Sequence, residues 1–110
     1  MLFELEWTDE VRAAYTRLKN DASQKKRYKA VKKTIGLLAE NPRHKSLQTH
    51  PFFSLKGPNG EKVFEAYAEQ KTPAVYRVFW FYGPSWGKIT IFAITPVRNH
   101  AWPDMPAYPI

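Results

Sequence analysis

The chain has 110 residues, a length that suits one domain, because chains usually split into domains only well above roughly 200 residues. It carries 17 Lys and Arg against 10 Asp and Glu, and the formal net charge of +7 favours a polyanionic partner such as nucleic acid. No cysteine is present, which excludes disulfides, cysteine-based zinc sites and a thiol nucleophile.

Two further features concern location. No apolar run approaches the roughly 18 residues that would span a bilayer. The N-terminal segment has acidic residues where a signal peptide would carry basic ones. We therefore expect a cytoplasmic protein with no membrane partner.

The N-terminal part of the chain is expected to form a strand and two helices. Residues 2–7 alternate between apolar and acidic side chains, which predicts an edge strand with one buried face. Thr8 is suited to cap a helix that extends to Asn20. A second helix is expected over about residues 24–40, because apolar residues recur there at helical spacing and Pro42 follows.

Three strands are expected in the C-terminal part. Residues 42–58 contain three prolines and are predicted to be irregular. Residues 63–69, 75–82 and 89–95 are rich in β-branched and aromatic side chains. The short links between these segments predict an antiparallel meander.

The order of these elements predicts an α+β fold. It consists of an N-terminal strand, an α-helical hairpin and a three-stranded antiparallel β-meander, with the helices packed on one face of the sheet. We expect residues 1–110 to form one domain, with residues 101–110 as a proline-rich C-terminal tail.

Basic residues gather on the second predicted helix. Residues 24–33 contain six Lys and Arg and no acid. Such clustering is typical of a surface for RNA or another polyanion, and the alternative is an ordinary solvated helix face. The five lysines that fall opposite the apolar stripe are the predicted RNA- and ribosome-binding residues: Lys25, Lys26, Lys29, Lys32 and Lys33.

Arg77 interrupts the most apolar predicted strand. An unpaired buried charge is costly, so the side of the strand that carries Arg77 is predicted to be open, with a carboxylate or an incoming anion as its partner. Glu65 on the neighbouring strand is either that partner or a general base. Phe79 and Phe81 share this side and are candidates for stacking on RNA bases, the alternative being core residues.

The remaining candidates for chemistry are cations and one histidine. His100 follows the last predicted strand and is interpreted as the only histidine near the open face, where it is either a proton donor and acceptor or an exposed loop residue. Arg98 and Lys56 are candidates for phosphate contacts. The histidines are too scattered to propose a metal site, and no motif indicates a cofactor.

Several short motifs, in their order, resemble the RelE/ParE toxin superfamily. They are Leu37 to Arg43 at the end of the second helix, Leu55-Lys56-Gly57, Val63-Phe64-Glu65 and Val75-Tyr76-Arg77-Val78. Tyr67 stands where many relatives carry an arginine, and the segment between Arg43 and Leu55 is longer than in the family pattern.

The resemblance implies the toxin of a type II toxin–antitoxin system, with a cognate antitoxin as its protein partner. In the RelE-like branch, which we favour, such a toxin is an endoribonuclease that enters the ribosome and cleaves mRNA without a metal. By position, the resemblance implies that Arg77 and Lys56 match basic site residues, and that Arg98 and His100 fall where the family has C-terminal site residues.

The expected mechanism is in-line attack of an RNA 2′-hydroxyl on the neighbouring phosphate, with Glu65 or His100 as base and cations at the phosphate. Two other interpretations stay open. One is a ParE-like inhibitor of DNA gyrase that does no chemistry, and the other is an inactive relative that only binds RNA or protein.

Overall fold

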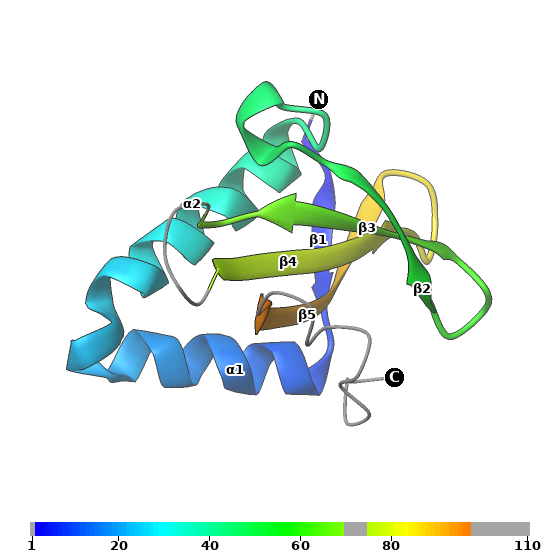
Figure 1. The fold of residues 1–110 in the computed structure, drawn as a ribbon. Helices are drawn as coiled ribbons and strands as arrows, with labels where there is room; N and C mark the ends of the chain where they lie inside the picture. Colours follow the sequence, from blue (N-terminus) through cyan, green and yellow to red (C-terminus); the bar gives the residue numbers. More distant parts are fainter. Residues whose placement is uncertain (1, 70–74, 98–110) are drawn as a thin grey trace.

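The protein has an α+β fold in which two helices accompany one mixed five-stranded sheet (Figure 1). The computed structural model describes residues 2–69 and 75–97. In chain order the elements are β1 (Glu4–Trp7), α1 (Asp9–Asn20), α2 (Lys25–Glu40), β2 (His50–Lys56), β3 (Lys62–Tyr67), β4 (Val75–Tyr82) and β5 (Lys88–Val97). Short 3₁₀ turns at Ala22–Gln24 and Lys45–Leu47 precede α2 and β2.

The sheet has the strand order β1-β5-β4-β3-β2. Strands β3, β4 and β5 form the predicted antiparallel meander. Strand β1 lies at one edge, as predicted, and pairs in parallel with β5. None of the described helices is long and apolar enough to cross a membrane.

The helices follow from local sequence signals. The hydroxyl of Thr8 accepts a hydrogen bond from the Val11 amide at 3.1 Å and so caps α1, as predicted. Helix α2 begins at Lys25 and ends at Glu40, directly before Asn41 and Pro42. The predicted boundaries of both helices are therefore confirmed to within one residue.

Strand β2 corrects the prediction that residues 42–58 are irregular. Pro51 lies within this strand and pairs with Phe64 of β3. Proline lacks an amide donor, but β2 is the edge strand opposite β1, where one side of the backbone needs no partner. The pairing register shifts between Pro51 and Lys56, and Figure 1 shows β2 crossing in front of β3.

Apolar side chains pack on both faces of the sheet. The cluster on the helix side joins the two helices to the sheet and consists of Val11, Leu18, Val31, Ile35, Leu38, Leu47, Ala66, Val78, Trp80, Ile89, Ile91 and Ile94. The second cluster contains no helical residue and consists of Leu55, Val63, Phe79, Phe81, Phe92 and Ala93. The helices therefore cover one face, as predicted.

The face away from the helices is less open than predicted. Phe79 and Phe81 are 0% and 4% exposed. The ring of Phe52, on β2, packs edge-on against Phe79 with the centroids 5.0 Å apart, and Phe92 packs against Phe81. The prediction failed here because the strand that brings Phe52 over this face was itself not predicted.

Candidate functional site

A buried carboxylate stands at the centre of the candidate site. Glu65 lies on β3 and is 3% exposed. Its Oε1 lies 2.6 Å from Nε2 of His50, and its Oε2 accepts a hydrogen bond of 2.7 Å from Nη1 of Arg77. One carboxylate therefore holds a histidine and an arginine, and these three residues are called the Glu65 cluster below.

The sheet register explains why these residues meet. His50 of β2 is directly opposite Glu65 of β3, and Tyr67 of β3 is directly opposite Arg77 of β4. Directly opposed residues share a face, and residues two apart in one strand share it too. The cluster therefore lies on the face away from the helices, the side that the sequence predicts for Arg77.

Arg77 is held in place by Glu65 and by the ring of Tyr67. Its side chain is 17% exposed, and its guanidinium carbon lies 3.8 Å from the centroid of the Tyr67 ring. The Nε atom is buried and has no hydrogen-bond partner among the described residues. The pairing with Glu65 confirms the interpretation of Glu65 as the partner of Arg77.

His50 is the accessible member of the cluster. Its side chain is 43% exposed, and its ring packs edge-on against Tyr67. Besides the contact with Glu65, its Nδ1 lies 2.9 Å from the carbonyl oxygen of Gln48. One ring nitrogen thus faces the Glu65 carboxylate and the other faces a backbone carbonyl. A half-exposed imidazole oriented by a carboxylate is a typical acid–base group.

The sequence analysis missed His50. It named His100 as the only histidine near this face, and that prediction was wrong, because β2 brings His50 there. The available signal was the alternation of His50 with Phe52 around a proline that an edge strand tolerates. His100 and Arg98 lie outside the described residues.

The structure separates the other predicted residues from the cluster. Lys56 lies at the far end of β2, opposite Lys62, roughly 20 Å from His50 along an extended strand. Phe79 is opposite Glu65 but buried, as is Phe81, so neither offers a free ring face and the core interpretation is confirmed. These three residues are not part of the accessible site.

The predicted lysine face exists as a surface of α2. All five of its side chains are exposed, and no ion pair holds any of them within the described parts of the chain: Lys25, Lys26, Lys29, Lys32 and Lys33. Arg27 differs, because its Nε donates to Glu69 at 2.9 Å and its guanidinium lies over the Tyr76 ring. The basic residues of α2 thus divide into one structural arginine and five solvated lysines.

Within residues 2–69 and 75–97, no group of three or more His, Asp and Glu side chains is placed to hold a metal ion. The chain matches no family model, and comparison with curated proteins and with solved structures finds no match for it.

Proposed function

We propose that the chain is the toxin of a type II toxin–antitoxin system, a ribosome-dependent, metal-independent mRNA endonuclease of the RelE-like branch of the RelE/ParE superfamily. The observation that supports this proposal most is the Glu65 cluster, in which one buried carboxylate holds a half-exposed histidine and a partly exposed arginine. Cleavage of RNA by its own 2′-hydroxyl needs a proton-transfer group and cations at the phosphate. The cluster contains both.

In the proposed reaction the 2′ oxygen bonds to the adjacent phosphorus, the bond from phosphorus to the 5′ oxygen breaks, and a cyclic phosphate remains. Arg77 donates to the phosphate oxygens as negative charge develops on them. His50, which Glu65 orients, gives a proton to the departing 5′ oxygen. Glu65 has both oxygens occupied and acts as a positioning residue. His100 stays the predicted base for the 2′-hydroxyl proton.

The lysine face has a separate role in this proposal. It lies on α2, whereas the Glu65 cluster lies on the sheet face that carries no helix. Exposed lysines without ion pairs bind phosphates through charge alone, which makes affinity steeply dependent on salt. We assign Lys25, Lys26, Lys29, Lys32 and Lys33 to docking on ribosomal RNA.

Cleavage of a defined transcript in a cell-free translation system, followed by primer extension, tests the proposal. We expect Arg77→Met and His50→Gln each to reduce cleavage by about 10²-fold or more. Arg77→Lys, which keeps a charge beside Glu65, serves as a second variant in case Arg77→Met lowers stability. Lys56→Gln is the matched control, because Lys56 is an exposed cation at the other end of β2, and it should cleave like the parent.

The outcome decides between the three interpretations. Parent-like cleavage by all the Arg77 and His50 variants would overturn the assignment of the site. An intact transcript together with inhibited supercoiling by DNA gyrase would indicate the ParE-like function. An intact transcript without any effect on gyrase would indicate an inactive binding protein.

A further inference from the structure

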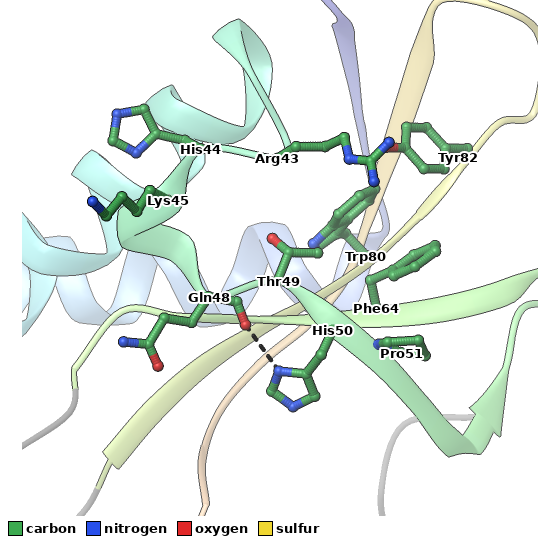
Figure 2. Close-up of a pocket in the computed structure, with 10 residues that line it drawn as sticks. All are labelled: Arg43, His44, Lys45, Gln48, Thr49, His50, Pro51, Phe64, Trp80 and Tyr82. Carbon is green, nitrogen blue, oxygen red and sulfur yellow. Dashed lines mark hydrogen bonds between the residues drawn. The ribbon is translucent and has the colours of Figure 1, made fainter.

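A cavity of about 540 Å³ opens beside the start of β2 (Figure 2). It lies between the loop that follows α2 and the helix-side surface of β3 and β4. Its lining combines aromatic, polar and basic side chains and contains no acidic residue: Arg43, His44, Lys45, Gln48, Thr49, His50, Pro51, Phe64, Trp80 and Tyr82. The mechanism proposed above uses only one of these residues, His50.

Three aromatic rings form one wall of the cavity. Phe64 and Trp80 are stacked, with centroids 4.9 Å apart and an interplanar angle of 23°. The Tyr82 ring meets both edge-on. Trp80 is fully buried and backs the wall, whereas Tyr82 is 43% exposed and Phe64 is partly exposed. The accessible rings therefore offer a surface on which a planar aromatic ligand can stack.

The opposite rim is basic. Arg43, His44 and Lys45 follow one another in the chain and are exposed, and neither Arg43 nor Lys45 forms an ion pair with any described residue. The amide of Arg43 donates to the Asn41 side chain at 3.0 Å, which fixes the backbone where the rim begins. Figure 2 shows the Arg43 side chain extended toward Tyr82. A cation and a stackable ring thus face the same space.

The cavity and the Glu65 cluster share His50. Thr49 and Pro51 line the cavity on either side of His50 in the chain, and the His50 imidazole contacts Glu65. An RNA strand that crosses the start of β2 would therefore touch both places. With RNA as the proposed substrate of the Glu65 cluster, this continuity favours a nucleotide over an unrelated aromatic anion.

We infer that the cavity is a nucleotide subsite, with a base stacked against Tyr82 and Phe64 and a phosphate bound by Arg43. The inference rests on the proposed function for its ligand class, because it treats the bound nucleotide as a neighbour of the one cleaved at the Glu65 cluster. Arg43 supplies two donors in a plane, which matches phosphate geometry.

Calorimetric titration of the full chain with nucleoside monophosphates, in the absence of ribosomes, tests this subsite. We expect a nucleoside without phosphate and ribose phosphate without a base each to bind at least about tenfold more weakly than the complete nucleotide. Tyr82→Leu and Arg43→Gln should each weaken nucleotide binding by about tenfold. Tyr82→Leu keeps apolar contact with Phe3 and Phe64, so the variant should fold, and its melting temperature checks this.

Two matched controls lie outside the cavity. Phe53 is an aromatic residue with 79% exposure and Lys56 is an exposed cation, and Phe53→Leu and Lys56→Gln should bind nucleotide like the parent. Absent binding at millimolar nucleotide, or binding that the Tyr82 and Arg43 variants leave unchanged, would overturn the inference. Binding through Tyr82 without mRNA cleavage would leave the subsite standing and refute the proposed function. Cleavage that depends on Arg77, without nucleotide binding in the cavity, would support the proposed function and refute the subsite.

Discussion

The two faces of the sheet are made from alternate residues of the same strands, yet they bury different kinds of polar side chain. Each face buries an apolar cluster. On the helix side the one buried polar residue of α2, Thr34, has its hydroxyl within hydrogen-bond distance of the carbonyls of Ala30 and Tyr67. On the other face Phe79 and Phe81 are buried, and so is Glu65, whose carboxyl group pairs with Arg77.

This difference is informative because buried charges seldom improve stability. Removing a carboxylate and a guanidinium from water costs several kcal/mol, and their attraction only roughly offsets that cost. A face devoted to packing would therefore carry apolar residues in place of Glu65 and Arg77. We conclude that the buried helix-side cluster serves mainly to hold the fold together, whereas the other face also buries charged groups at a cost in stability.

The largest expected effects compare the apolar centres of the two faces. Trp80 and Phe79 are neighbours in β4 that point to opposite faces, and both are 0% exposed. We expect Trp80→Ala and Phe79→Ala each to lower the free energy of unfolding by about 3–5 kcal/mol, measured by urea denaturation. A cost below about 1 kcal/mol for Phe79→Ala would show that the second face has no true core and would break the comparison.

The next effect concerns the buried charges. Glu65→Leu leaves Arg77 and His50 without their shared partner, and we expect it to lower the free energy of unfolding by about 3 kcal/mol. The double variant Glu65→Leu/Arg77→Leu should lie within about 1 kcal/mol of the parent, because an apolar pair replaces the ion pair. It should nevertheless lose mRNA cleavage. If the double variant is as unstable as the sum of Glu65→Leu and Arg77→Leu measured singly, each residue stabilises the fold independently of the ion pair, which contradicts this expectation.

The helices and the meander were predictable because their signals are local. The cap at Thr8, the apolar period of residues 24–40 and the alternation in residues 75–82 all act over a few residues. The side of β4 that carries Arg77 followed from the same period of two. For the partner of Arg77 the sequence left two alternatives, a carboxylate such as Glu65 or an incoming anion. The pairing register between two strands cannot be deduced from the sequence of either strand alone.

The histidine of the site was not predictable in the same way. Glu65 meets His50, fifteen positions away, only because β2 pairs with β3 in one particular register. Pro51 argued against a strand there, since proline is rare in strands except at a sheet edge. Which strand lies at the edge depends on the whole sheet and cannot be deduced from the local sequence. Without β2, whose Phe52 packs on Phe79, the pattern in β4 alone does not predict that this face is covered. The missed features are therefore all consequences of a single long-range pairing.

A smaller effect concerns a charge on the helix side. Arg27 joins α2 to Glu69 at 2.9 Å, with the two side chains 22% and 12% exposed, and lies 4.6 Å from the Tyr76 ring centroid. We expect Arg27→Met to lower the free energy of unfolding by about 1 kcal/mol and to leave cleavage unchanged. Lys29→Met, on the exposed side of the same helix, should change the free energy of unfolding by less than about 0.5 kcal/mol. Loss of cleavage in Arg27→Met would contradict the division of roles between the faces.

The smallest expected effect is a loss of stability at high pH that involves Tyr15 of α1. Burial, followed by the hydroxyl of Tyr28 at 3.5 Å, raises the pKa of Tyr15 above its usual 10.0. Because the folded pKa is raised, this tyrosine's contribution to stability is complete below pH 10.0 and is lost as the pH rises toward the raised value. The urea midpoint of the parent should therefore fall more than that of Tyr15→Phe between pH 9 and about pH 10.5. Equal falls in both proteins would show that the tyrosine pair between the helices ionises as freely as in water.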